Sequence, residues 1–476
     1  MNTKKGMALL LVVILAMVSL SACRKTGTPE ESGQPENTLL TEGEGFRAGF
    51  ARNACLPSGS VPMRGYGDTL NRMSEGLLTE LCVTCIAVTD ANDVTELLFT
   101  YDLCGIPDDW AEIVRSRCQE AFGIDPVHVK LTGTHTHSSV DYEMSELDTV
   151  KKFMEDLTDK SVQTAEEALK DRSAALMYWG EVDLTGYNFL RHFVLDDGTV
   201  FANNTNWNKA LMERCVGYPY EVDHTMYAVC FKREGAKDIY FTNWRAHAVI
   251  TGNTKNLSAD YPATFRQYVE KELDCCVGYY QGTAGNVNPV SRIAADCMPN
   301  INEIDHRDLK LYGQGMGEKF VDAVKNSEWK LIGDGTGEIR TAEYVFVGDT
   351  YDASRMTWGK KEDGTEGQLR DPSDSALKGK SGDSTEKIYV TAIGDFAFTE
   401  SPNEQYAQSN DMIRSASPFE YTMVIGYSNG THGYLPVKEA FTEPYVDTYE
   451  VRVTKFGFGA LENLVDTFVE MLKTIK

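Results

Sequence analysis

Short apolar runs rich in β-branched and aromatic residues recur along the chain, and amphipathic helical patterns separate several of them. Runs of this length and composition indicate buried strands. The expected strands cover residues 82–88, 96–101, 127–131, 226–231, 239–244, 389–393 and 422–425. Strands that alternate with helices are typical of α/β proteins, in which functional residues lie on loops after strand ends. The pattern therefore predicts a mixed α/β fold.

Three stretches have the apolar spacing of amphipathic helices. The clearest covers residues 108–122, with Asp108 as the expected N-cap and Gly123 as the stop. The other two are expected over 148–170 and 461–475. The stripe expected to face the core in the first helix consists of Trp110, Ile113, Val114, Cys118, Ala121 and Phe122.

The length and composition of the chain are those of a large globular protein. It has 476 residues, of which 42% are hydrophobic and 25% charged, so a disordered chain and a small disulfide-stabilised domain are excluded. Residues 46–476 contain no repeat and no second linker, which predicts one large domain, although this length also allows two lobes. The formal net charge of −25 repels phosphate backbones, so nucleic acid is not an expected partner.

The N-terminus has the pattern of an export signal. Two lysines precede a mostly apolar run over residues 7–20, which is short for a membrane span. The tetrapeptide Leu20-Ser21-Ala22-Cys23 resembles a bacterial lipobox, so residues 1–22 are expected to be removed and Cys23 to be lipidated. Residues 23–45 then form a flexible tether. We expect an extracytoplasmic, cell-envelope lipoprotein anchored to a membrane by acyl chains; a plain secretory signal is the alternative.

Two histidines stand two residues apart after an expected strand, in Thr134-His135-Thr136-His137-Ser138. In extended backbone, residues two apart project to the same side, so both imidazoles can face one cavity. Such a pair suits a metal ion, and hydrogen-bonded structural histidines are the alternative. His247 likewise follows the expected strand 239–244. A zinc hydrolase draws its ligands from several loops of this kind.

Three further segments contain candidate site residues. Glu404 follows the strand-like run 393–398 and a turn, although a glutamate in so acidic a chain is more often solvent-facing. The small residues of the loop 281–289 would let backbone N–H groups approach a substrate oxygen. The turn-rich segment 426–436 contains Tyr434, which from composition alone is a packed loop aromatic.

Taken together, these segments resemble the neutral/alkaline, non-lysosomal ceramidase family. Each matching motif is short, but their common order along the chain is hard to obtain by chance. The motifs are Phe46-Arg47-Ala48-Gly49, Met63-Arg64-Gly65-Tyr66, Thr134 to Ser138, Arg191 before Asp197-Gly198-Thr199, Asn243 to His247, Ser258-Ala259-Asp260-Tyr261-Pro262, Gln281 to Pro289, Pro402-Asn403-Glu404, Gly433-Tyr434-Leu435-Pro436 and Tyr449-Glu450. The resemblance implies the mixed α/β fold of the N-terminal, catalytic ceramidase domain.

The resemblance also implies one Zn²⁺ ion as cofactor, together with the residues around it. His137 would move a proton or orient the attacking water, and Arg191 and Tyr449 would face the substrate, with Tyr445 as the alternative to Tyr449. The implied zinc ligands are His135, His247, Glu404 and Tyr434.

The chain departs from the ceramidase pattern at two places. Ceramidases have a serine, proposed as nucleophile in some accounts, where this chain has Gly282 followed by Thr283. Glycine has no nucleophile, so zinc-activated water fits better than attack by a side chain. True ceramidases also continue into an immunoglobulin-like domain, whereas this chain ends after the helix expected at 461–475.

The sequence therefore predicts a lipid-anchored zinc hydrolase that cleaves the C–N amide bond of an N-acylated amine, such as a ceramide-like lipid. One alternative keeps the metal but acts on an ester or a small peptide-like amide. The other alternative is a surface lipoprotein that binds a ligand without catalysis.

Overall fold

The computed structural model of the chain describes residues 45–66, 70–202, 209–290, 308–333, 337–350, 356–360, 366–370, 382–442, 444–446 and 448–476. These residues belong to one structural unit that spans residues 40–476. The expected signal over 1–22, the lipidation site Cys23 and nearly all of the tether lie outside the described residues.

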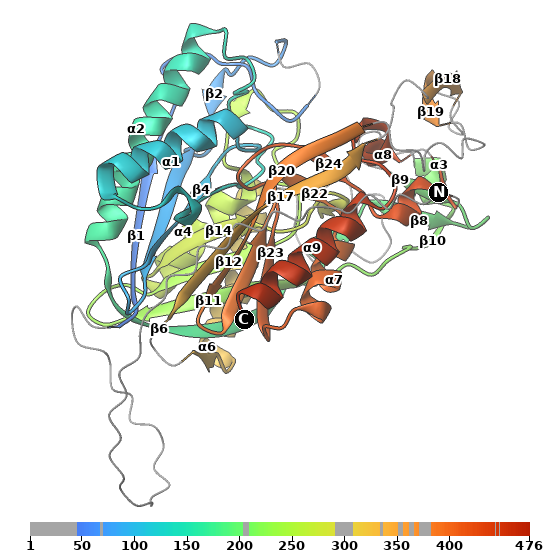
Figure 1. The fold of residues 1–476 in the computed structure, drawn as a ribbon. Coiled ribbons are helices and arrows are strands. Elements are labelled where there is room, and N and C mark those ends of the chain that lie inside the picture. The colour runs from blue at the N-terminus through green and yellow to red at the C-terminus, as the bar shows by residue number, and fades with distance from the viewer. Residues whose placement is uncertain are drawn as a thin grey trace, which may run out of the picture. The chain divides into compact units, whose positions relative to one another are not determined.

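The largest sheet in the described part of the chain has nine strands, most of them antiparallel to their neighbours (Figure 1). In sheet order they are β14 (Cys276–Gln281), β12 (Ile239–Trp244), β11 (Thr225–Arg233), β6 (Ser173–Asp183), β1 (Arg47–Ala54), β3 (Cys82–Thr89), β4 (Thr95–Tyr101) and β5 (Val129–Gly133), with β16 (Lys330–Ile332) paired beside β6. The pairs β12 with β14 and β4 with β5 are parallel.

A second sheet of four strands and several short ladders complete the β structure. The second sheet has the order β17 (Ile339–Thr350), β20 (Gly382–Ile393), β21 (Phe396–Glu400) and β23 (Tyr421–Ile425). The ladders are β2 (Gly76–Leu77) with β13 (Asn256–Leu257), β7 (Asn188–Leu190) with β15 (Val287–Pro289), β18 (Met356–Lys360) with β19 (Glu366–Arg370), β22 (Asn403–Gln405) with β24 (Gly433–Leu435), and β10 (Cys215–Gly217), β8 (His192–Leu195), β9 (Val200–Ala202) and β25 (Tyr445–Val446) in one small sheet.

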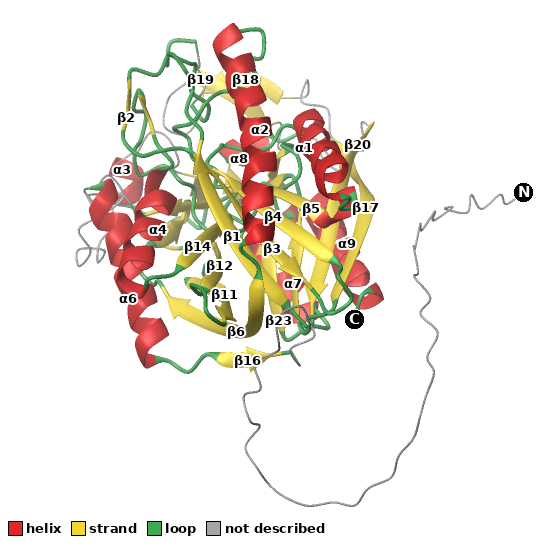
Figure 2. Ribbon diagram, turned by 90° about the vertical axis from the view of Figure 1, so that its left-hand side faces the viewer, coloured by secondary structure: helices red, strands yellow, loops and turns green. Residues whose placement is uncertain are grey.

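Helices cover the outer face of each large sheet. The nine-stranded sheet is covered by α1 (Asp108–Phe122), α2 (Asp148–Lys170), α4 (Asp260–Leu273) and α6 (Leu309–Asn326) (Figure 2). The four-stranded sheet is covered by α7 (Gln408–Ala416) and α9 (Ala460–Thr474). The remaining short helices are α3 (Lys209–Met212), α8 (Tyr449–Val453), η1 (Pro126–His128) and η4 (Lys438–Phe441).

The inner faces of the two large sheets pack against each other through apolar side chains. Along β11, Val229 and Phe231 face the second sheet, whereas the alternate residues Ala228 and Cys230 face the helices, as the two-residue period of a strand requires. Phe398 on β21 belongs to the same inner layer. The described elements therefore stack as helices, sheet, sheet and helices, which confirms the expected mixed α/β fold.

The strands and helices expected from the sequence are confirmed, with one displaced strand. Strand β12 and helices α1 and α2 have the expected bounds. The run at 127–131 instead begins as the turn η1, because Pro126 holds its φ angle in the helical range, and strand β5 starts at Val129. The segment 426–436, expected to be a turn, contains the three-residue strand β24.

The expected start of α1 is wrong in one detail. Pro107 is the N-cap residue, and the Asp108 carboxylate lies 2.7 Å from Nε2 of His432 instead of capping the helix. Proline suits a position that needs no N–H donor, and a carboxylate in the first turn is favoured by the helix dipole.

The buried stripe of α1 is also narrower than expected. Ile113 is 51% exposed and Ala121 is exposed, so neither belongs to the core. Trp110, Val114 and Cys118 are buried at a spacing of four residues, and a stripe with that spacing leaves position 113 on its outer edge.

A charged side chain is buried between the sheets at the end of β21. Glu400 is 1% exposed, and its Oε2 atom has no hydrogen-bond partner within the described part of the chain. Burial raises the pKa of Glu400, Lys130 opposes the rise and Glu96 adds to it, and the result is a pKa of about 7. The folded protein thus binds this proton more tightly than the unfolded chain does.

We predict that Glu400→Gln stabilises the protein at pH 8 but not at pH 4.5. The folded-state pKa of about 7 lies above the ordinary value of 4.5, so the wild type loses stability as the pH rises between these values, and the glutamine does not. The gain in the free energy of unfolding at pH 8 should reach up to about 3 kcal/mol. Denaturant unfolding at both pH values measures it, with the exposed Glu120→Gln as control; a larger gain at pH 4.5 would contradict this account.

Candidate metal centre

Strand ends from both large sheets bring the expected metal ligands together. His135 follows β5, and His247 follows β12 in the nine-stranded sheet. Glu404 lies on β22, which follows β21 of the second sheet, and Tyr434 lies on β24. The strands β22 and β24 are parallel, and Glu404 stands directly opposite Tyr434 in their register.

Backbone pairing ties these segments to one another. A parallel bridge joins Thr136 to Ala248, so the residues that follow β5 run beside those that follow β12. A second bridge joins Thr132 to Ser428 in the segment that leads to Tyr434. The Gly285 N–H donates to the Gln405 carbonyl at 2.8 Å, next to Glu404. The positions of the ligands are therefore set by main-chain hydrogen bonds.

Three of the four expected ligands offer atoms that lie within 4.8 Å of one another: His135, His247 and Glu404. Glu404 Oε2 is 3.4 Å from Nε2 of His135 and 3.3 Å from Nε2 of His247. Two ligand atoms on one tetrahedral Zn²⁺ ion lie roughly 3.3 Å apart, given metal–ligand distances of about 2.0–2.1 Å. The hydroxyl of Tyr434 is 3.5 Å from Nε2 of His247. The separations between ligand atoms therefore fit one small cation.

Main-chain carbonyls orient both imidazoles. His135 Nδ1 lies 2.6 Å from the Cys104 carbonyl oxygen, and His247 Nδ1 lies 3.0 Å from the Val287 carbonyl oxygen. A carbonyl accepts hydrogen bonds only, so each Nδ1 carries the proton and each Nε2 offers its lone pair, as in many metal-binding histidines. His135 also has a φ of 61°, a left-handed conformation that is rare for residues other than glycine.

The protonation states of Glu404, His247 and His135 favour the binding of a cation. Burial would raise the pKa of Glu404, but His135 and His247 hold it well below its ordinary value, so the carboxylate is ionised. Burial and the charge of Arg191 lower the pKa of His247 to about 4. For His135, burial lowers the pKa, but Cys104 and Glu404 together raise it to about 10. A proton on His135 supplies the positive charge that a divalent cation would otherwise bring.

These donors suit a catalytic zinc site. Two neutral imidazole nitrogens and a carboxylate oxygen are the ligands of several zinc hydrolases. Glu404 Oε2 is buried and has no hydrogen-bond partner among the described residues, and such an atom is costly unless something else binds it. The residues therefore fit the metal that the resemblance implies.

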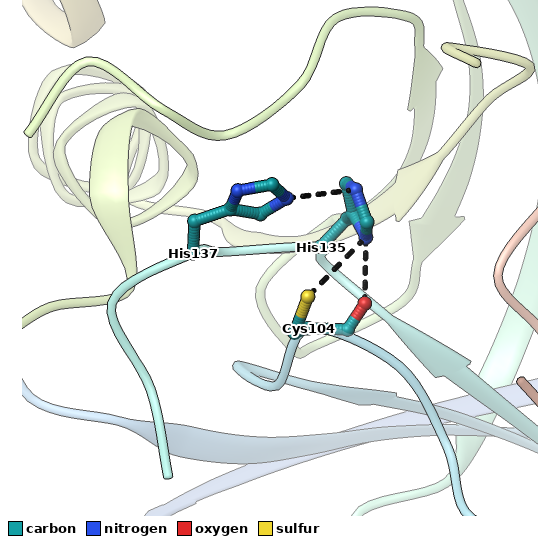
Figure 3. Close-up of side chains that lie close together, drawn as sticks. All are labelled: Cys104, His135 and His137. Carbon is teal, nitrogen blue, oxygen red and sulfur yellow. Dashed lines mark hydrogen bonds between the residues drawn. The ribbon is translucent and has the colours of Figure 1, made fainter. Parts of the chain in front are cut away.

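His137 lies beside this ligand set but outside it. Its Nε2 is 3.1 Å from Nε2 of His135, and the two rings meet edge to face (Figure 3). His137 groups instead with Cys104 and His135. Burial, with His135 and His247 nearby, lowers the pKa of His137 well below its ordinary value, so it is a neutral imidazole at pH 7. This position agrees with the role of proton carrier that the resemblance implies.

Arg191 is held rigidly next to Tyr434. Its guanidinium carbon lies 5.5 Å from the centre of the Tyr434 ring. The Arg191 Nε–H donates to Glu450 at 2.6 Å, and the two terminal nitrogens donate to Asn288 and to the Gly285 carbonyl. A guanidinium has five N–H donors, so these three acceptors do not exhaust it.

The two tyrosines expected as alternatives lie in different places. The Tyr449 ring packs edge to face against the ring of Tyr434, with their centres 5.8 Å apart. The Tyr445 ring packs against His192 instead, at 5.9 Å. Of these two tyrosines, Tyr449 is therefore the one that packs against the expected ligand Tyr434.

The glycine-rich loop lies near the cluster, and two of its backbone N–H groups are bonded within the protein. The N–H groups of Gly282 and Gly285 donate to the carbonyls of Trp244 and Gln405, so they are not directed at a ligand. A Cβ atom at position 282 would lie 3.1 Å from the Trp244 carbonyl oxygen. A serine there would require a main-chain shift. Thr283 is fully buried, and its hydroxyl has no hydrogen-bond partner among the described residues.

A cavity of about 40 Å³ adjoins His135 and Glu404. Its other lining residues include Cys104, Gly105, Tyr427 and Thr431. A buried water needs a cavity volume of roughly 10–15 Å³, so this cavity is large enough to hold water next to the ligand cluster.

Several residues of this centre are not among the expected site residues, including Tyr427, whose ring centre lies 4.1 Å from that of His135. Cys104 lies beside His135, and the Glu450 carboxylate holds both Arg191 and His192. Cys104 follows the end of β4, where functional residues are common, but its sequence position does not show that it meets His135. The pairing of Glu450 joins residues 259 positions apart in the chain, and no local sequence pattern indicates it.

Comparisons with known proteins support the fold. Neither the protein-family models nor the curated proteins include a match to this sequence. Among solved structures, the neutral ceramidase from Pseudomonas aeruginosa is similar with a TM-score of 0.67 and 17% identity, over 90% of this chain and 74% of that chain. A ceramidase complexed with C2 is similar with a TM-score of 0.67 and 16% identity, over 90% and 75% of the two chains. The chain thus has the fold of neutral ceramidases, as the resemblance implied.

We predict that the purified chain binds about one zinc ion and that His247→Ala and Glu404→Gln abolish this binding, because each removes one of three protein ligands. His137→Ala should still bind about one zinc ion. Metal analysis after dialysis against excess zinc measures the ratio, and circular dichroism checks that each variant is folded. Equal zinc loss in His137→Ala and His247→Ala would make His137 a ligand.

Proposed function

We propose that the chain is a zinc-dependent amidohydrolase that cleaves the C–N bond of an N-acylated amine by attack of water. The observation that supports this most directly is the position of Glu404 Oε2, 3.3–3.4 Å from the Nε2 atoms of His135 and His247. The fold shared with neutral ceramidases adds support for an amide substrate, including ceramide-like lipids.

Four side chains would hold the ion: the three clustered residues and the more distant Tyr434. When bound, Zn²⁺ supplies Lewis acidity, which polarises a carbonyl and makes water more acidic near neutral pH. The three clustered residues are His135, His247 and Glu404. The remaining chemistry belongs to side chains around this set.

His137 would carry the proton of the reaction. The water oxygen forms a bond to the acyl carbon, and the C–N bond breaks. A neutral imidazole at His137 can accept the proton that the water loses and donate it to the leaving amine. Its ring meets the Tyr66 ring edge to face, with their centres 5.3 Å apart, and this contact restricts its orientation.

Arg191 and Tyr449 would stabilise the oxygen that gains negative charge. The guanidinium is fixed by Glu450, so it needs little rearrangement when the charge develops. A fixed donor of this kind contributes roughly 3 kcal/mol to other acyl-transfer enzymes.

We predict that His135→Ala abolishes hydrolysis of a fluorogenic N-acyl amide, whereas Thr283→Ala retains it, because water and not a hydroxyl attacks. Arg191→Lys, which keeps a charge beside Glu450, should lower kcat by about 100-fold or more without changing the zinc content. Initial rates and metal analysis on the same preparations measure both effects. An inactive Thr283→Ala protein with normal zinc would refute attack by water.

A matched ester of the same acyl group separates the enzymatic alternatives. The proposal requires amide hydrolysis that is lost with zinc. Ester hydrolysis alone would identify an esterase, and the absence of any hydrolysis from a zinc-loaded protein would favour a binding lipoprotein.

We also propose that the protein acts outside the cytoplasm as a lipoprotein anchored through Cys23. Support comes from the lipobox-like sequence Leu20-Ser21-Ala22-Cys23 and the polar segment that follows it. Among the described residues, no helix has the length and apolar character to cross a membrane.

We predict that Cys23→Ala moves the protein from the membrane fraction to the soluble fraction and blocks incorporation of labelled fatty acid, because the anchor is the acyl chains. Immunoblots of fractionated cells and metabolic labelling measure this. The matched control is Cys215→Ser, which lies in the folded part and should not change the distribution. Membrane association of unlabelled Cys23→Ala protein would contradict a lipid anchor.

A further inference from the structure

Cys104 adds a thiol to the histidines of the metal centre (Figure 3). Its Sγ atom is 3.8 Å from Nδ1 of His135, and the side chain is 8% exposed. Cys104, His135 and His137 each offer a ligand atom within 4.8 Å of the others. These three residues form a second ligand set, which we call the thiol set.

The thiol set overlaps the zinc ligands at His135. His135 Nε2 lies 3.4 Å from Glu404 Oε2 and 3.1 Å from Nε2 of His137. Its Nδ1 keeps the proton that is donated to the Cys104 carbonyl, so Nε2 is the one ring nitrogen that can lose its proton and offer a lone pair to a cation. One lone pair binds one cation, and therefore the two ligand sets compete for His135.

The two sets differ in chemical softness. The set of His135, His247 and Glu404 combines imidazole nitrogens with a carboxylate and suits zinc. The thiol set replaces the carboxylate with sulfur, and thiolate ligands select softer cations.

A separate observation shows that His137 has bonding capacity left. Its Nδ1 atom is buried and has no hydrogen-bond partner among the described residues. This nitrogen lies on the side of the ring away from Cys104 (Figure 3), so it can carry the ring proton and leave the Nε2 lone pair to bind a cation of the thiol set. The His137 ring also packs closely against Gly65, where an added Cβ would lie 2.4 Å from the ring. This contact limits movement of the ring away from His135 and Cys104.

We propose that a thiophilic divalent cation, represented by Cd²⁺, binds Cys104, His135 and His137 and thereby excludes zinc from the hydrolytic ligand set. Binding breaks the S–H bond of Cys104 and the N–H bond at His135 Nε2, forms a sulfur–cadmium bond and a nitrogen–cadmium bond, and releases both protons to solvent. No oxidant or reductant takes part. The inference rests on the proposed function only for its consequence, which is that a soft cation inhibits hydrolysis.

The decisive experiment compares Cd²⁺ and Zn²⁺ binding by the full chain after removal of metals with a chelator. Cd²⁺ bound to Cys104 produces thiolate-to-cadmium charge-transfer absorbance in the ultraviolet. Cys104→Ser should lose the corresponding part of this band and bind Cd²⁺ at least about tenfold more weakly. His247→Ala lies outside the thiol set and should keep both the band and the affinity. The two variants should have the opposite effects on Zn²⁺: His247→Ala loses zinc binding, and Cys104→Ser keeps it.

Two controls keep the result interpretable. Cys215→Ser removes a thiol that is in neither ligand set, so its cadmium band should equal that of the wild type. Cys104→Ala, checked by circular dichroism, replaces Cys104→Ser if the serine variant does not fold. Equal Cd²⁺ affinity and equal absorbance in wild type and Cys104 variants would overturn the proposal.

Activity provides a further readout. In Cys104→Ser, the Cd²⁺ concentration that halves zinc-supported hydrolysis should rise by about tenfold or more. An unchanged value, with the cadmium band still dependent on Cys104, would overturn the competition for His135. If no preparation hydrolyses an amide, the proposed function fails, but the spectroscopic test of the thiol set still decides this inference.

Discussion

The candidate metal centre depends on the apolar packing between the two large sheets. Phe241 on β12 packs against Phe396 and Phe398 on β21, with ring centres 5.8 and 5.7 Å apart. Because this contact joins strands of different sheets, the segments that follow them emerge next to each other. His247 and Glu404 follow these strands, and their side chains are 3.3 Å apart. Burial of aromatic surface thus supplies the free energy that holds a polar cluster together.

The cluster itself is costly, since it concentrates ionisable groups where water is scarce. Glu404 stays ionised because His135 and His247 lower its pKa against the effect of burial. A bound cation and a proton on His135 are two ways to meet the same requirement. This explains why His135 is shared by two ligand sets: its Nε2 atom faces the carboxylate on one side and His137 on the other.

The loop beside the centre contains a glycine at a position where packing leaves little room for a side chain. Gly282 donates its N–H to Trp244, and its α-carbon lies so close to that residue that a side chain would be crowded. The position serves to pack β14 against the residues after β12, and it cannot supply a nucleophile. The charged groups at the other side of the centre are better suited to catalysis, because Glu450 fixes Arg191 by a buried ion pair.

The sequence by itself determined the elements, since apolar periodicity is a local property. The bounds of β12, α1 and α2 agree with the periodicity, whereas the exposed Ile113 shows that periodicity alone does not give the exact orientation of a helix. Motif resemblance also singled out His135, His247 and Glu404. Only the tertiary structure decided which groups meet: Tyr449 and not Tyr445 beside Tyr434, and Cys104 beside His135. The physical reason is that these contacts depend on how two sheets pack, and residues far apart in the chain carry no local signal of that packing.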